Sequence, residues 1–93
     1  MRAIEWTGQF KRDFKRESKG QYRATLDDDL FPVVDYLAND QPLELRYGDH
    51  PLFGNWKDHR DCHIKPDLVL IYQKSDNSLL RLVRLGSHSE LGL

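Results

Sequence analysis

The stretch from Arg60 to Gly86, RDCHIKPDLVLIYQKSDNSLLRLVRLG, decides the fold. It contains strand-like runs at 60–64, 68–74 and 79–86. The segments between them, KPD and SDNS, are short and polar enough to form hairpin turns. The run from Leu68 to Tyr72 is apolar at every position, which predicts a central strand buried on both faces. We therefore expect the second half of the chain to form an antiparallel meander.

The first 40 residues predict one strand and two helices. Residues 2–6, RAIEW, indicate a short strand. In GQFKRDFKRESKG at 8–20, Phe10 and Phe14 share one helical face, and Gly20 is the expected C-cap. A second helix is expected over 26–39, where an apolar stripe recurs at helical spacing. That stripe consists of Leu26, Leu30, Val33 and Leu37.

Local signals refine the ends of these elements. Asp27, Asp28 and Asp29 suit the positive end of a helix dipole, so this acidic run has a structural explanation. Pro32 predicts that the second helix starts near Asp28 or bends. Residues 48–59 read as a long loop with a short strand near Trp56. The expected fold is a single α+β domain over 1–93, with an N-terminal strand and two helices packed on one face of an antiparallel sheet.

Composition restricts the class of protein. Of the 93 residues, 39% are hydrophobic and 31% are charged, as in a small globular domain. No apolar run approaches the ~20 residues of a membrane span, and the N-terminus lacks a signal-peptide core. The one cysteine, Cys62, has no partner for an internal disulfide, and it fits a reducing cytoplasm. Residues 1–23 carry a net charge of +4 and residues 27–40 a net charge of −5. Such charges usually form a solvated helix face, although a basic segment can also attract phosphate.

Titratable side chains gather between His50 and Asp67, a segment that holds three of the four histidines. If 59–64 is extended, alternation places His59, Asp61 and His63 on one face of the strand. This pattern is compatible with a metal site, an acid–base site or an ordinary polar loop. A His-x-Asp-x-His run offers nitrogen and oxygen ligands, whereas two imidazoles with carboxylates can divide the proton transfers of RNA cleavage.

The order of short motifs from residue 49 onward resembles one family closely. The motifs are DHPL at 49–52, GNWKDHRDCHI at 54–64, PDLVLIY at 66–72 and RLVRLGSHSEL at 81–91. Together they resemble the YafQ-type toxins of the RelE/ParE toxin–antitoxin superfamily. The resemblance implies the RelE or microbial-RNase-like fold and a cytoplasmic mRNA endoribonuclease that acts in the ribosomal A site without metal or cofactor. It also implies a toxin that is monomeric alone and forms a larger complex with a cognate antitoxin.

The resemblance also assigns roles to side chains. It implies that His88 is the main proton-transfer residue, with His50 and His63 assisting and with Asp61 and Asp67 orienting these rings or contacting a base. His59 is not a family position and is expected to lie on the surface. The basic side chains expected to bind substrate and stabilise its charge are Arg60, Arg81, Arg84 and Lys57.

Two features depart from the family pattern. Gly92 stands where these toxins often carry an aromatic residue, and the isoelectric point of 6.4 is low for a ribosome-binding toxin. The alternatives are a non-enzymatic gyrase inhibitor of the ParE type and a degraded toxin that acts as a binding module. The histidine set argues against the first of these, because the ParE branch lacks it.

Overall fold

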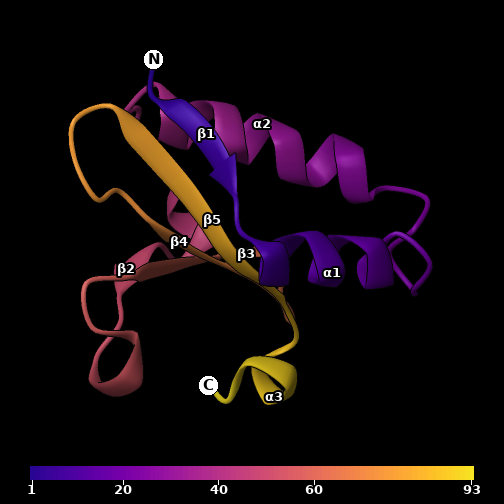
Figure 1. The fold of residues 1–93 in the computed structure, drawn as a ribbon. Helices are drawn as coiled ribbons and strands as arrows, with labels where there is room; N and C mark the ends of the chain where they lie inside the picture. Colours follow the sequence, from indigo (N-terminus) through magenta and orange to yellow (C-terminus); the bar gives the residue numbers. More distant parts are fainter.

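The computed structural model describes all residues, 1–93, and shows a five-stranded sheet with helices on both faces (Figure 1). Along the chain the elements are β1 (Ala3–Trp6), α1 (Gly8–Glu17), α2 (Leu26–Ala38), η1 (Leu45–Tyr47), β2 (His50–Pro51), η2 (Gly54–Trp56), β3 (Arg60–Lys65), β4 (Leu68–Gln73), β5 (Leu79–Gly86) and α3 (His88–Leu91). The strand order is β1-β5-β4-β3-β2. None of the helices has the length and apolar character needed to cross a membrane.

The predicted meander is confirmed. Strands β3, β4 and β5 pair antiparallel, and β4 is the central strand, with Leu68 to Tyr72 buried at every position. β1 joins the sheet on the far side of β5 and runs parallel to it, so the sheet is mixed. The two helices between β1 and the meander make this parallel return possible, because a crossover needs about a dozen residues or more.

The two faces of the sheet carry cores of very different size. On one face, α1 and α2 bury the main core of 15 side chains, which includes Cys62 and the predicted stripe of α2. On the other face, Val69 and Ile71 pack with Leu91 of α3 and with the half-buried Leu52 and Trp56. Alternation along β3 and β4 therefore assigns each side chain either to the large core or to the small, polar-rimmed face.

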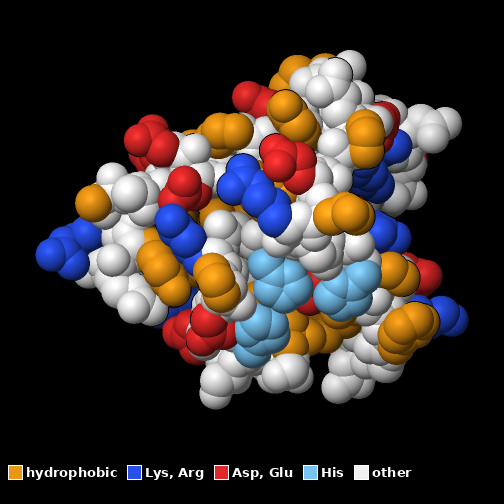
Figure 2. Space-filling model, turned by 180° about the vertical axis from the view of Figure 1, so that it is seen from behind, with side chains coloured by type: hydrophobic (Ala, Val, Ile, Leu, Met, Phe, Trp, Pro, Cys, Tyr) orange, Lys and Arg blue, Asp and Glu red, His pale blue; other side chains and the backbone are white.

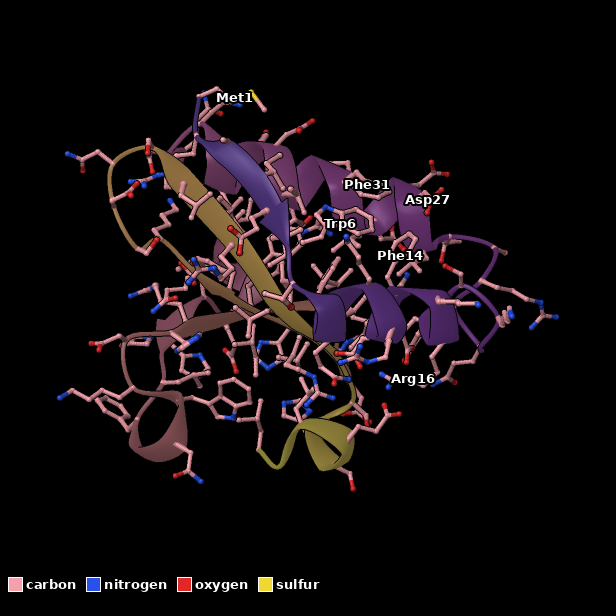
Figure 3. The ribbon with its side chains drawn as sticks, in the orientation of Figure 1. Met1, Trp6, Phe14, Arg16, Asp27 and Phe31 are labelled. Carbon is pink, nitrogen blue, oxygen red and sulfur yellow. The ribbon has the colours of Figure 1, made fainter.

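The helices match their predicted faces but differ at their ends. Phe10 is buried, and Figure 3 shows Trp6, Phe14 and Phe31 gathered between β1, α1 and α2. α1 ends at Glu17 with Ser18 as its C-cap, so the prediction of Gly20 as the cap is wrong. The hydroxyl of Ser18 donates a hydrogen bond to the carbonyl of Phe14, and the helix ends two residues earlier than predicted.

Three further details concern the ends of elements. α2 spans Leu26–Ala38, which confirms the helix expected over 26–39; Pro32 lies inside it and does not delay its start to Asp28. The short strand expected near Trp56 is instead β2 at His50–Pro51, and Trp56 lies in η2. α3 was not predicted, because a four-residue helix leaves no periodic pattern; Ser87 begins it with a capping box that includes Glu90.

Asp40 joins three segments at the end of α2. Its carboxylate lies 2.8 Å from both Arg2 Nε and Lys74 Nζ, and its φ of 56° is left-handed. Hydrogen bonds from Lys74 and Arg2 lower the pKa of Asp40 to about 2. A carboxyl group with a depressed pKa stabilises the fold above its unfolded pKa and loses that contribution as the pH falls through its folded pKa.

We predict that Asp40→Asn lowers the melting temperature at pH 7, because Asn adopts the same left-handed backbone but removes the charge. The difference from the wild type should shrink as the pH falls below about 4 and vanish near pH 2, where Asp40 itself becomes protonated. Thermal denaturation followed by circular dichroism across this range measures the effect. Asp58→Asn is the matched control, because Asp58 also has a positive φ but forms no ion pair. A difference between the Asp40 variant and the wild type that is independent of pH would contradict the prediction.

Candidate functional site

Three histidine rings form a row on the face of the sheet opposite α1 and α2. Figure 2 shows three histidine side chains side by side on one surface. The ring centroids of His50 and His63 are 6.2 Å apart, and those of His63 and His88 are 5.2 Å apart. His50 comes from β2, His63 from β3 and His88 from the first position of α3. Segments that are distant in sequence therefore meet here, as the resemblance implied; we call these three residues the histidine row.

Sheet pairing explains why the row forms. β2 pairs with β3 so that His50 lies opposite Asp61, and His63 follows two residues later on the same face. Cys62 and Ile64 point the other way into the main core and hold β3 in this register. Burial raises the pKa of the Cys62 thiol, so Cys62 acts as a packing residue.

The end of the row at His88 is fixed by Asp67. One oxygen of this carboxylate accepts hydrogen bonds from the backbone N–H of His88 at 2.9 Å and from its Nδ1 at 2.7 Å. These two bonds lower the pKa of Asp67, so the carboxylate is ionised at neutral pH. A carboxylate only accepts hydrogen bonds, and the proton of this contact therefore resides on Nδ1 of His88.

Two successive backbone carbonyls orient the other two rings. The carbonyl of Tyr47 accepts from Nδ1 of His63 at 3.2 Å, and the carbonyl of Gly48 accepts from Nδ1 of His50 at 2.8 Å. Gly48 has a left-handed φ of 57°, and a Cβ at this position would lie 2.9 Å from Nδ1 of His63. Because a carbonyl cannot donate, each of these Nδ1 atoms must carry a proton. The turn after η1 thus holds both rings with their Nε2 atoms available for chemistry.

The contact between His63 and His88 follows from these constraints. Their Nε2 atoms are 3.2 Å apart, and both Nδ1 atoms already carry protons. A hydrogen bond between the two Nε2 atoms therefore needs one proton between them, which gives the pair a single positive charge. In this arrangement one Nε2 is a hydrogen-bond donor and the other is an acceptor.

Asp61 lies beneath the row and is almost completely buried, at 2% exposure. Its Oδ1 lies 3.0 Å from Nδ1 of His50, within ion-pair distance, but it accepts no hydrogen bond of good geometry. Burial raises the pKa of Asp61, and the neighbouring histidines oppose this effect. Asp61 therefore places a poorly solvated carboxyl group behind His50, while Asp67 places a solvated one behind His88.

His59 does not belong to the row. Its Nδ1 bonds to the carbonyl of Lys57, and its ring meets the edge of Trp56. The triplet of His59, Asp61 and His63 is therefore not assembled, and no group of three or more histidine, cysteine or acidic side chains is placed to hold one metal ion.

The four basic residues expected to bind substrate are placed differently. Arg60 contacts Asp49 at 3.3 Å, Arg81 contacts Glu5 at 2.8 Å, and Arg84 contacts the buried Asp13 at 2.7 Å. Lys57, at the end of η2, forms no ion pair. The side chain of Arg60 is 43% exposed, whereas that of Arg84 is only 22% exposed. Of the three arginines, Arg60 therefore offers the most free surface.

Sequence reasoning missed two side chains that support the site. The carboxylate of Asp49, which pairs with Arg60, also accepts a hydrogen bond of 2.6 Å from the hydroxyl of Tyr72. Burial, and then Asp49 itself, raises the pKa of that hydroxyl, so Tyr72 remains a neutral donor. These contacts hold the start of β2 in place and therefore position His50. The sequence contained a signal for both residues, because Asp49 lies in the motif DHPL and Tyr72 lies in the motif PDLVLIY.

Comparison with known proteins finds relatives that match almost the whole chain. Residues 2–92 match the family model described as "Bacterial toxin of type II toxin-antitoxin system, YafQ". The chain is 40% identical to the mRNA interferase toxin YafQ of Escherichia coli K12 over 90 residues, which cover 97% of this chain and 95% of that protein.

Two crystal structures extend the comparison. A copper-bound variant toxin from Helicobacter pylori has a TM-score of 0.85 at 39% identity, covering 98% of this chain and 99% of that one. The E. coli DinJ-YafQ toxin-antitoxin complex contains a chain with a TM-score of 0.81 at 41% identity, covering 97% of this chain and 96% of that one.

The hydrogen bonds of the row predict its tautomers. We expect the neutral rings of His63 and His88 to carry their proton at Nδ1, as measured by long-range proton–nitrogen NMR correlation of the rings. Asp67→Ala should remove this preference at His88 and leave it at His63, because the carbonyl of Tyr47 is unchanged. The arrangement would be refuted if His63 were protonated mainly at Nε2 when neutral.

The buried carboxylate of Asp13 predicts a large effect on stability. Asp13 is fully buried and accepts hydrogen bonds from Arg84, Arg16, Gln9 and the N–H of Leu85. Burial alone would raise its pKa, but the bonds from Arg84 and Leu85 lower it. Asp13→Asn should therefore reduce the free energy of unfolding at pH 7 by about 3 kcal/mol, measured by urea denaturation. Asp35→Asn, at an exposed position on α2, should change it by less than about 0.5 kcal/mol. Equal effects of the two substitutions would contradict this reading.

Proposed function

Since the chain belongs to the YafQ family of toxins from bacterial type II toxin–antitoxin systems, we propose that the histidine row is the centre at which it cuts mRNA. The chain is an mRNA interferase, an endoribonuclease that inhibits translation, and its partner is a cognate antitoxin. The comparisons do not support the alternatives of a gyrase inhibitor or a toxin reduced to a binding module. The observation that carries the proposal is the chain of contacts from Asp67 through His88 to His63.

The proposed reaction is the attack of a ribose 2′-oxygen on the adjacent phosphorus. The bond from phosphorus to the 2′-oxygen forms, and the bond to the 5′-oxygen of the next nucleotide breaks. One imidazole accepts the proton of the 2′-hydroxyl, and an imidazolium gives a proton to the leaving 5′-oxygen. The products are a 2′,3′-cyclic phosphate and a free 5′-hydroxyl, with no net gain or loss of protons.

The row supplies one imidazole on each side of His63, and a carboxylate lies next to each of these two rings. We assign the two proton transfers to His88, oriented by Asp67, and to His50, oriented by Asp61. His63 lies between them, exchanges a proton with His88 and places positive charge beside the phosphate. Charge that is already in position stabilises a phosphorane without costly reorganisation.

The basic side chains take different parts in this proposal. Arg60 alternates with Asp61 along β3, so its side chain starts on the opposite face of the sheet from the row, beside Asp49 and Lys74. Its exposed surface suits a phosphate contact at the edge of the sheet. Lys57 lies between η2 and β3, three residues before Arg60, and forms no ion pair. Arg81 and Arg84 reach the substrate only beside the carboxylates that hold them, so we expect smaller contributions from these two.

The proposed cleavage of mRNA on the ribosome also implies where the protein acts and with what it assembles. An mRNA interferase that acts in the ribosomal A site works in the cytoplasm, and we propose this location and this site of action. The toxin alone is proposed to be monomeric and to enter a larger complex with its antitoxin. Acid–base chemistry by the row needs no metal or cofactor. The copper bound by the H. pylori relative makes an explicit test with chelator necessary.

We predict that His88→Ala lowers mRNA cleavage by about a hundredfold or more, as expected when a general acid–base group is lost. Cleavage is measured by primer extension on mRNA incubated with ribosomes and purified protein, with and without EDTA. Wild-type cleavage should persist in EDTA. His59→Ala is the matched control, because His59 lies outside the row, and this variant should cut like the wild type.

Growth arrest in cells gives a second readout of the same variants. Expression of the wild type and of His59→Ala should stop growth, and co-expression of the antitoxin should restore it. If His88→Ala folded and still arrested growth as strongly as the wild type, the assignment of His88 would be wrong. Abolition of wild-type cleavage by EDTA would instead overturn the metal-independent mechanism.

A further inference from the structure

The largest cavity of the molecule, about 470 Å³, opens beside the histidine row. Its wall includes His63, and it extends from there between η1, the N-terminal turn of α2 and the β3–β4 turn. The lining residues used below are Asp29, Arg46, Tyr47 and Lys65. Because His63 borders both the cavity and the proposed cleavage centre, whatever occupies the cavity lies next to the scissile phosphate.

One side of the cavity offers a flat surface. The guanidinium of Arg46 lies over the ring of Tyr47, with its Cζ 4.7 Å from the ring centroid, and Nη2 donates to the Tyr47 hydroxyl at 2.8 Å. The side chain of Arg46 is 69% exposed, and its one ion pair, with Glu44, is long at 3.5 Å. Guanidinium planes and aromatic rings are the surfaces on which unstacked RNA bases pack.

The other side offers a donor next to an acceptor. Lys65 Nζ lies 2.8 Å from Asp29 Oδ2, and both side chains are about one-third exposed, at 32% and 34%. The hydrogen bond from Lys65 lowers the pKa of Asp29, so the pair presents an ammonium group beside a carboxylate. Adenine and cytosine carry an exocyclic amino donor beside a ring acceptor, whereas guanine and uracil carry a keto acceptor beside a ring N–H. For a base held in one orientation, the Lys65–Asp29 pair therefore complements either the amino edge or the keto edge, and not both.

We propose that this cavity binds the nucleobase that flanks the scissile phosphate, and that Asp29 and Lys65 distinguish amino bases from keto bases there. The inference rests on the proposed function, since it assumes that the row cuts RNA. Arg46 and Tyr47 supply binding that is independent of sequence, because every base has a flat face. Asp29 and Lys65 supply the selectivity, because they meet the edge on which bases differ.

The experiment maps cut sites on a pool of mRNAs with ribosomes, comparing the wild type with the double variant Asp29→Lys and Lys65→Asp. The exchange preserves an ion pair but reverses donor and acceptor. We expect the ratio of amino to keto bases flanking the cut to change by about tenfold or more, so that the preferred class of base is reversed. The single variant Asp35→Asn, at an exposed position on the same helix, should keep the wild-type pattern.

A second variant tests the flat surface. Arg46→Ala should raise KM for the ribosome–mRNA complex by about tenfold while leaving kcat and the flanking preference unchanged. The proposal is overturned if the exchanged variant cuts with the wild-type preference. If the exchanged variant does not fold, an unchanged KM in Arg46→Ala overturns it. Failure of the wild type to cut any mRNA would instead reject the proposed function itself.

Discussion

The alternation of β3 is the constraint on which the rest of the site depends. Cys62 and Ile64 are committed to the main core, so Asp61 and His63 must face the opposite side of the sheet. A slip of one residue would bury the histidine and expose the apolar side chains, which makes the register strongly specified. The packing that stabilises the fold therefore also positions the acid–base groups.

The parts of the fold that the sequence predicts are those with strong local periodicity. The apolar run of β4 and the stripe of α2 are each visible in a single window of residues, and both were placed correctly. The parallel pairing of β1 with β5 joins residues about 75 positions apart, and no local pattern encodes it. α3 was missed for a different reason, because a single turn depends on the capping residues Ser87 and Glu90 more than on periodicity.

The site shows a similar division. Strand alternation alone selected His59 together with Asp61 and His63, and the structure excludes His59 because it precedes β3 and turns toward Trp56. The family resemblance brought in His88, whose meeting with His63 spans 25 residues. Neither route identified the carbonyls of Tyr47 and Gly48, because backbone acceptors have no side-chain signature and depend only on the shape of a turn.

That turn has a consequence for the site as a whole. Because backbone carbonyls and Asp67 occupy every Nδ1 position of the row, the only variable site between His63 and His88 is the gap between their Nε2 atoms. With two protons in this gap the rings repel as like charges, and with none the facing lone pairs repel. Only the state with a single proton draws the rings together. Substrate that binds at the gap therefore meets two facing ring nitrogens that can hold one proton between them.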